Sequence, residues 1–283
     1  MRNSRTRIHE GIDILALHRD ERNEPTDLVT ASFGGEVAHL NNNIAASNYG
    51  KYIVLHHVVD GLPVYTLYAH LKEIADELEI GQTVSGGDTL GILGRTTNTN
   101  DGIAKDRAHL HFEIGLQIHT QFESWFRHWY KGGNNFHGAW NGVNLLGLDV
   151  AEILRLEAAG KFDLRLYLSK QPTMCRVRIH QPQLEWAERF PKLVVQTVQA
   201  ETLPVQGWEV DLNFNAIPIR LKPLYAKGLK QKSGGVRFEL LEVIDEERRK
   251  HPCRSLVFKK GARWVLTTKG LRALDLLAWQ NGE

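Results

Sequence analysis

The sequence has few cysteines, no long apolar run and almost no net charge. Two cysteines among 283 residues, Cys175 and Cys253, are too few for a disulfide framework or a cysteine-rich zinc site. No stretch reaches the roughly 18 to 20 apolar residues of a membrane-spanning helix, so we expect no membrane span. A formal net charge of only +2 argues against a strongly basic nucleic-acid protein and against an acidic disordered tail. Thirteen histidines remain as potential metal ligands.

The N-terminal stretch MRNSRTRIHEGIDI also lacks the features of a secretory signal. It has a basic start, but no apolar run of about 7 to 15 residues and no small-residue cleavage site. We therefore expect either that the protein stays in the cytoplasm or that the chain lacks its export segment.

Length and charge both predict two domains. A prior of about 150 residues per domain gives two for a chain of this length. Residues 1–150 carry 12 basic and 18 acidic side chains, a net charge of −6, whereas residues 151–283 carry 23 and 15, a net charge of +8. The near-neutral total thus hides an acidic half and a basic half. We predict domains at 1–148 and 149–283.

Short β-type runs separated by glycine follow one another from about residue 27 to residue 116. They predict an all-β meander, or a small barrel-like antiparallel sheet. Strict alternation in VYTLYAHL would place His70 on the same face as Thr66 and Tyr68. The acidic stretch LKEIADELEI is consistent with one helical turn or with a loop. The predicted strands are LVTASF, GEVAHL, KYIVLHHVV, PVYTLYAHL, TVSGGDTLGIL and HLHFEIGL.

Residues 116–148 are rich in glycine and asparagine and contain a cluster of aromatic residues. This composition predicts a long irregular surface segment. Two interpretations stay open: an insertion that pads the domain edge, or a wall of a substrate groove, for which tryptophan and tyrosine offer flat apolar area. The cluster consists of Trp125, Phe126, Trp129 and Tyr130.

The C-terminal half mixes helical and strand patterns. LDVAEILRLEAAG predicts an amphipathic helix ending at Gly160, and LRALDLLAWQ predicts a closing helix. The whole chain is therefore predicted to be α+β, with an all-β N-terminal domain and a mixed α+β C-terminal domain. The predicted strands of the second domain are FDLRLYLS, CRVRIHQ, KLVVQTV, GWEVDLNF, VRFELLEV and ARWVLTT.

Three short segments concentrate the histidine signal, and two of them also contain carboxylates. If HLHFEI is a strand, His109 and His111 leave the same face and can reach one point, whereas a helix would set them roughly 200° apart. A catalytic zinc takes three protein ligands and keeps one position open. His9, Asp13 and one of the paired histidines would supply a two-His, one-carboxylate set, and the remaining histidines would serve proton transfer and oxyanion stabilisation. The segments are His9-Glu-Gly-Ile-Asp13, Tyr68-Ala-His70-Leu71 and His109-Leu-His111-Phe-Glu113.

Glu113 shares the face of the two histidines on such a strand. It could act directly in catalysis, but we favour a hydrogen bond to a ligand histidine, because metal-bound imidazoles usually have such a partner. The nearby GILGR lacks the lysine and the following helix of a phosphate-binding loop. Gly91 and Gly94 are better explained by turns or by close approach of strands.

The motifs and their order resemble the lysostaphin-like, LytM-type zinc metalloendopeptidases, which cut peptidoglycan cross-bridges. The family's His-x-x-x-Asp, Tyr-x-His-Leu and His-x-His motifs are all found, with GQTVSGGDTLGILGRT before the last. The resemblance covers about residues 5–115. It implies one zinc ion per chain bound by His9, Asp13 and His111. It also implies that His70 and His109 flank the reacting water as general base and transition-state stabiliser.

By this resemblance, the chain would hydrolyse peptide cross-links of bacterial peptidoglycan outside the cytoplasm. Its partners would be peptidoglycan peptide stems or cross-bridges. An alternative from another class is a non-catalytic cell-wall-binding or amidase-regulating protein that retains the fold. Family members that only regulate have typically lost metal ligands, and none is lost here.

The basic C-terminal half has three interpretations: an ordinary solvated surface, a site for an anionic wall polymer, or a nucleic-acid site. RWVLTTKGLRALDLL resembles the end of a winged-helix domain over a short stretch only. We therefore consider nucleic acid unlikely as a partner.

The sequence departs from the family pattern in two places. Only eight residues precede His9, where the family usually has a strand and an aromatic-rich loop, and this favours a mature fragment. The stretch HRDERNEPTD is more charged than the family's usual APxGTPV segment. Because both places border the expected groove, cleavage of D-Ala to diaminopimelate links and cleavage of glycine bridges both stay open.

Overall fold

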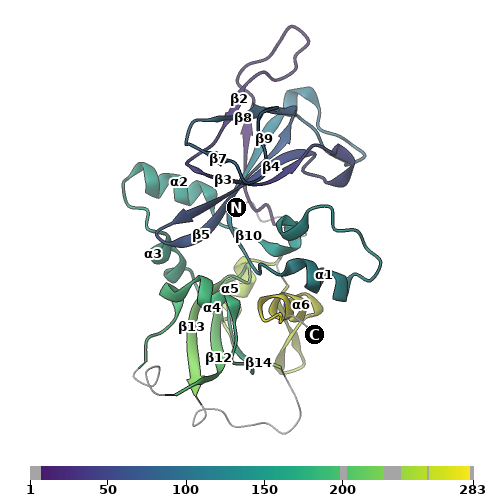
Figure 1. Ribbon diagram of the computed structural model, residues 1–283. Helices are drawn as coiled ribbons and strands as arrows, with labels where there is room; N and C mark the ends of the chain where they lie inside the picture. The colour runs from purple at the N-terminus through teal and green to yellow at the C-terminus, as the bar shows by residue number, and fades with distance from the viewer. Residues whose placement is uncertain (1–7, 198–202, 226–236, 254, 281–283) are drawn as a thin grey trace. The chain divides into compact units, whose positions relative to one another are not determined.

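A computed structural model shows two compact units, and the first consists of residues 10–117 and 134–160 (Figure 1). The second consists of residues 8–9, 118–133 and the described part of 161–283. The predicted α+β class is confirmed, since antiparallel sheets occur together with six α-helices among the described residues. The structure describes residues 8–197, 203–225, 237–253 and 255–280.

The first unit contains two antiparallel sheets, and each strand predicted there is present at least in part. The larger has seven strands in the order β1-β9-β5-β4-β3-β7, with β10 also paired to β9; the smaller has the order β2-β8-β6. The stretch LKEIADELEI contains a short strand and turns, so the helical turn considered for it is wrong. The strands are β1 (Ile12–Leu15), β2 (Leu28–Thr30), β3 (Gly35–Asn41), β4 (Lys51–Val59), β5 (Leu62–Leu71), β6 (Glu73–Ile74), β7 (Thr83–Val84), β8 (Thr89–Ile92), β9 (His109–Gln117) and β10 (Leu145–Gly147). The helical elements are η1 (Ile44–Ala46), η2 (Lys105–Arg107), η3 (Gly138–Trp140), η4 (Gly142–Asn144) and α2 (Val150–Ala158).

The larger sheet is buried on both faces. The Tyr68 hydroxyl on one face accepts a hydrogen bond from the Ser32 backbone N–H at 2.9 Å, beyond the end of β2. On the other face, buried side chains form a core cluster against which Tyr49 and Trp140 pack. Burial of one large apolar side chain stabilises a fold by about 1.5–3 kcal/mol. This cluster therefore fixes the strand register on the face that also carries the histidines. Its members are Tyr52, Val54, Tyr65, Leu67, Ala69 and Leu145.

Two glycines of GILGR lie where backbones approach closely. A Cβ atom at Gly91 would be 2.3 Å from the carbonyl oxygen of Glu73, and one at Gly94 would be 2.2 Å from the backbone nitrogen of Lys72. Side chains cannot occupy this space. The explanation of these glycines by close approach of strands is confirmed.

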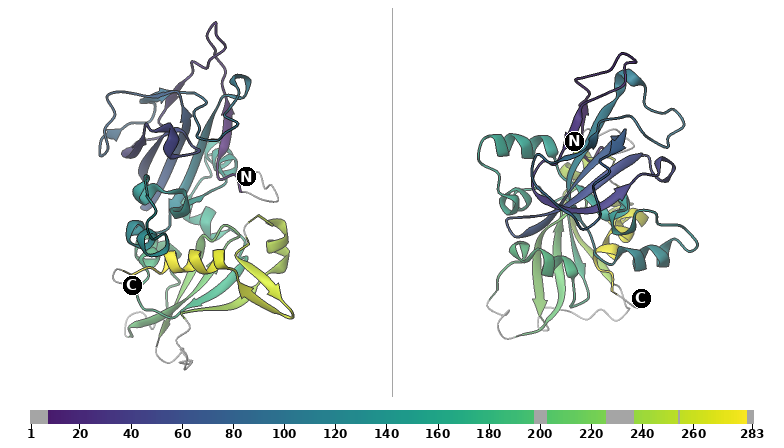
Figure 2. Two further views of the ribbon diagram at one scale, coloured as in Figure 1. Left: turned by 90° about the vertical axis from the view of Figure 1, so that its right-hand side faces the viewer. Right: turned by 45° about the horizontal axis from the view of Figure 1, so that its top comes forward.

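The second unit is built on a four-stranded antiparallel sheet with the order β13-β12-β11-β14. A separate hairpin, β15–β16, leads into the closing helix α6 (Figure 2, left). None of the helices in the described part of the chain is long and apolar enough to cross a membrane. The strands are β11 (Cys175–Ile179), β12 (Val205–Leu212), β13 (Pro218–Tyr225), β14 (Phe238–Val243), β15 (Val257–Lys260) and β16 (Arg263–Leu266). The helices are α1 (Phe122–Trp129), α3 (Leu164–Ser169), α4 (Glu185–Arg189), η5 (Pro191–Leu193), α5 (Asp245–Lys250) and α6 (Thr268–Leu277).

Two strands predicted in this unit are wrong. FDLRLYLS forms the helix α3, because the Asp163 side chain caps it by accepting from the Leu166 N–H at 2.6 Å. Its buried residues, Leu164, Tyr167 and Leu168, have the i, i+3, i+4 spacing of a helix rather than the alternation of a strand. KLVVQTV begins in η5 and, within its described residues, contributes one isolated bridge, between Val194 and Leu221.

The prediction of an irregular surface segment is wrong for residues 122–129, which form α1. Phe122, Trp125 and Phe126 are buried at helical spacing. The indole N–H groups of Trp125 and Trp129 donate to the same oxygen of Asp275 in α6, at 2.9 and 2.6 Å. Trp125 and Phe126 are thus core residues of the second unit, whereas Trp129 is 37% exposed.

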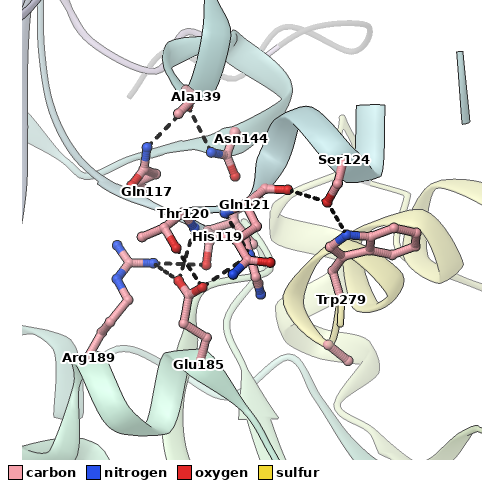
Figure 3. Close-up of polar contacts among 12 residues, drawn as sticks. Gln117, His119, Thr120, Gln121, Ser124, Ala139, Asn144, Glu185, Arg189 and Trp279 are labelled. Carbon is pink, nitrogen blue, oxygen red and sulfur yellow. Dashed lines mark hydrogen bonds and ion pairs between the residues drawn. The ribbon is translucent and has the colours of Figure 1, made fainter. Parts of the chain in front are cut away.

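Polar contacts fix the segment before α1 to the rest of the second unit (Figure 3). The backbone N–H and the hydroxyl of Thr120 donate to the Glu185 carboxylate at 3.0 and 2.7 Å. Arg189 donates both to Glu185 and to the carbonyl oxygen of Ile118, each at 3.1 Å. The Trp279 indole N–H donates to the Ser124 hydroxyl at 2.6 Å. The contacts of Arg189 and Trp279 are partly buried, whereas those of Thr120 are exposed.

Candidate metal centre

The register of three neighbouring strands brings the predicted site residues together. Strand β9 lies between β1 and β5, and His111 of β9 is directly opposite Asp13 of β1 and Ala69 of β5. Side chains of directly opposite residues leave the same face of a sheet. Since His109 is two residues from His111 on β9, its side chain leaves that face as well.

His70 reaches the same face through a break in the strand pattern. Regular alternation predicts His70 on the sheet face opposite to that of Ala69. The backbone of His70, however, has a φ of +64°. Its ring consequently lies 4.9 Å from the ring of His109 and 6.0 Å from that of His111, measured between centroids. The predicted face for His70 is therefore wrong. A left-handed non-glycine residue costs about 1–3 kcal/mol, and such strain concentrates at functional sites.

His9, Asp13 and His111 form a group with the geometry of a metal site. One potential ligand atom from each lies within 4.8 Å of the other two. Two imidazole nitrogens and one carboxylate oxygen form a donor set typical of catalytic zinc, which keeps a further position open. The residues present therefore fit this metal.

The protonation of His111 also favours a cation at this point. Its Nε2 donates to Glu113 Oε1 at 2.8 Å, so its Nδ1 directs a lone pair at Asp13 Oδ1, 3.2 Å away. Two acceptors this close repel each other unless a proton or a metal ion lies between them. Burial alone would lower the pKa of His111, but hydrogen bonds to Asp13 and Glu113 raise it to about 9. The surroundings of Nδ1 thus strongly stabilise positive charge.

Glu113 is the centre of a buried hydrogen-bond network. Besides His111, the Tyr49 hydroxyl donates to its Oε1 at 2.5 Å, and the Tyr65 hydroxyl donates to its Oε2 at 2.9 Å. Burial alone would raise the pKa of Glu113, but these three hydrogen bonds lower it, so the carboxylate stays ionised. The favoured prediction of a hydrogen bond between Glu113 and a paired histidine is confirmed. A buried carboxylate of this kind fixes the tautomer and the orientation of a ligand imidazole.

His70 and His109 are both oriented by a backbone carbonyl group. Each Nδ1 lies 2.8 Å from a backbone carbonyl oxygen, that of Thr96 for His70 and that of Arg107 for His109. A carbonyl only accepts, so each Nδ1 carries a proton, and Nε2 has a lone pair whenever the ring is neutral. Burial lowers the pKa of His70 to about 4, and His109 Nε2 lies 3.5 Å from Asp13 Oδ1. Both rings can therefore accept a proton beside the candidate metal site.

The charged stretch HRDERNEPTD forms a well-anchored loop of the first unit. The Arg95 guanidinium binds the Glu24 carboxylate through Nε and Nη2, both at 3.0 Å, and Lys105 Nζ lies 3.0 Å from the same carboxylate. Hydrogen bonds from Arg95 and Lys105 lower the pKa of Glu24 to about 2. The Asp27 carboxylate accepts from the backbone N–H groups of Leu17 and His18. The departure from the family pattern is thus a defined loop.

Sequence reasoning missed Tyr49 and Tyr65 in the site. Neither lies in one of the three histidine motifs, and each reaches Glu113 only through the tertiary fold. The alternation in β5 does place Tyr65 on the face of Ala69, and this pattern was the one available indication. Tyr49 lies in a loop, where no periodicity applies.

Two imidazoles and a carboxylate on adjoining segments, with two further histidines beside them, are the residue types that metal-dependent hydrolases use. Residues 7–121 match the model of peptidase family M23, and the resemblance based on the motifs is thereby confirmed. This match includes all five predicted site residues.

Solved structures similar to the chain overlap with it only in part. The catalytic domain of the antimicrobial peptidase lysostaphin from Staphylococcus simulans is 25% identical over 38% of this chain and 66% of that chain, with a TM-score of 0.28. A zinc-containing peptidase from Vibrio cholerae is 22% identical over 36% of this chain and 32% of that chain, with a TM-score of 0.25. The chain spans less than two thirds of the length of either structure. The comparison with curated proteins gave no match.

Proposed function

We propose that the chain is a zinc-dependent endopeptidase that hydrolyses peptide cross-links of bacterial peptidoglycan outside the cytoplasm. The match to peptidase family M23 supports peptidase activity in general. The observation that carries the narrower proposal is the approach of one ligand atom each from His9, Asp13 and His111 to within 4.8 Å. His70 and His109 contact the same group from one side.

In this proposal the side chains divide the work of amide hydrolysis. Zinc, when bound to His9, Asp13 and His111, supplies a Lewis acid that polarises a carbonyl group and acidifies water. His70 or His109 accepts the proton of the attacking water at Nε2 and later donates it to the leaving amine. Glu113 holds His111 in the tautomer that leaves Nδ1 available as a ligand.

A chelator experiment on purified sacculi tests this proposal. We expect the protein to release peptides with new amino termini, a chelator to stop the release, and added zinc to restore it, because hydrolysis depends on the metal. Mass spectrometry of the released peptides identifies the bond that is cut. If the protein binds sacculi without releasing peptides, with or without chelator, the non-catalytic wall-binding or amidase-regulating alternative replaces the proposal.

Substitution Glu113→Gln is expected to weaken zinc binding by about 10- to 100-fold, the usual effect of losing the carboxylate that orients a ligand histidine. The amide keeps the size of the side chain but cannot accept from His111, Tyr49 and Tyr65 with the strength of a carboxylate. Competition with a fluorescent zinc chelator measures the affinity. The matched control, Glu73→Gln on an exposed side chain of β6, should leave the affinity unchanged. Equal affinities for the two variants would show that Glu113 has no role in the site.

A further inference from the structure

A trough with basic side chains crosses the second unit. It runs from α3 past η5 to β13, where it adjoins a smaller hollow over β11 and β12; Val195 and Arg220 line both. The larger part holds about 1000 Å³ of space, partly open to solvent. The cationic side chains along it are Arg165, Lys192 and Arg220. No part of the candidate metal centre contributes to this surface.

The carboxylates near the trough are already engaged. On the sheet face, Arg176 binds Asp211 at 2.6 Å and Arg178 binds Glu209 at 2.7 Å. Strand register places Arg220 opposite Asp211, but Asp211 is held by Arg176 instead. Asp163 caps α3.

The guanidinium groups of Arg165 and Arg220 therefore have no carboxylate partner among the described residues. Two arginines that line one hollow without such partners form a local excess of positive charge. The net charge of +8 over residues 151–283 adds to it. The trough is thus suited to an anionic ligand.

The lining of the trough limits the kind of anion. It includes the aliphatic side chains of Leu166, Leu193 and Ile219. None of its described lining residues is aromatic. Single-stranded nucleic acids are bound mainly on aromatic stacking platforms, and duplexes are read by protein elements that enter their grooves. A hollow without aromatic side chains fits neither, but it fits a flexible acyclic chain with regularly spaced charges.

We propose that this trough binds an extended, acyclic polyanion whose charged groups are phosphates or carboxylates, with Arg165 and Arg220 as its main contacts. Arginine forks bind both kinds of oxyanion through paired hydrogen bonds. This inference rests on the proposed function in one respect: it assumes that the protein encounters the polymer in the bacterial wall. Binding there would hold the peptidase unit at its substrate.

Binding of two defined polymers to the full chain tests this inference. Fluorescently labelled poly(glycerol phosphate) and poly-glutamate represent the phosphate and carboxylate sources, and anisotropy gives the dissociation constants. We expect the double substitution Arg165→Gln/Arg220→Gln to weaken binding of the preferred polymer by about 10-fold or more. The matched control, Lys260→Gln/Arg263→Gln at the exposed tip of the β15–β16 hairpin, removes the same charge from the same unit and should change it less than about twofold.

Several results would overturn the inference: equal losses in the two double variants, no binding of either polymer, or tighter binding of a DNA duplex than of both. Thermal unfolding of each variant shows whether the substitutions leave the fold intact, as expected for side chains on the surface. Cleavage of polymer-free cross-linked peptides, measured in parallel, should be unchanged in both double variants. If the unsubstituted protein binds a polymer but cleaves no peptide, only the proposed function is contradicted. If it cleaves peptides but binds neither polymer, only this inference is contradicted.

Discussion

Replacement of His111 with alanine is expected to leave the protein without stoichiometric zinc and to lower cross-link cleavage by more than about 1000-fold, because the metal supplies the Lewis acid of the reaction. Nδ1 of His111, the proposed ligand atom, faces Asp13, and the other ring nitrogen is held by Glu113. Alanine removes both contacts at once. Zinc content by inductively coupled plasma mass spectrometry and peptide release from sacculi measure the two effects.

The same substitution also removes a partner from a buried carboxylate. Glu113 would lose one of three donors, at a cost to the free energy of unfolding of about 1–3 kcal/mol. Asp13→Asn separates loss of metal from loss of stability, since this side chain is 40% exposed and the change replaces one oxygen by an amide nitrogen. It should also lose zinc, whereas His128→Ala, at an exposed histidine of the second unit, should retain it. A His111→Ala protein that keeps one zinc ion per chain would refute the ligand assignment.

The strands of the first unit could be predicted because alternating apolar residues and glycines at turns are visible within short segments of the sequence. The runs that became β4, β5 and β9 have long alternating or apolar patterns, which determine their class without tertiary information. In the second unit, none of the apolar residues of FDLRLYLS is β-branched, and their spacing fits a helix as well as a strand. The side chain of Asp163 caps the first turn and thereby favours the helix. A cap residue lies outside the hydrophobic pattern and was therefore overlooked.

The aromatic cluster shows a second limit of sequence reasoning. Glycine and asparagine after residue 130 suggested an irregular surface, yet Trp125 and Trp129 bind Asp275 more than 140 residues away. A contact over that separation leaves no local pattern. The i, i+3, i+4 spacing of Phe122, Trp125 and Phe126 was present, but it covers little more than one turn of helix.

The candidate site was easier to predict from the sequence than the fold, because only a few residue types bind metal ions. Period-two spacing of His109 and His111 requires one shared face, whichever strands lie beside it. Their pairing with Asp13 follows from register, which no single segment determines. The left-handed backbone at His70 could not be predicted, since it violates the alternation of its own strand. The two tyrosines that hold Glu113 needed the tertiary fold for the same reason.

Alanine at His109 or at His70 is expected to separate catalysis from metal binding. Each ring has Nδ1–H bound to a backbone carbonyl and a lone pair on Nε2, so each can serve as proton acceptor without being a ligand. We expect both variants to retain one zinc ion per chain and to lose about 100- to 10,000-fold in kcat, the usual contribution of general acid–base catalysis. KM should change little, because neither ring is proposed to hold the substrate.

The comparison between the two variants assigns the roles. The variant that lacks the general base should have the lower residual rate, because the attack by water needs a base. In that variant alone, the acidic limb of the pH dependence of kcat/KM should disappear. The ring of His70 also contacts those of His109 and His111, and a full zinc ion per chain in His70→Ala excludes a disturbance of the metal ligands. If either variant retained full activity, that histidine would have no catalytic role. Loss of zinc from His109→Ala would instead make His109 a ligand and leave His70 as the one proton acceptor beside the metal.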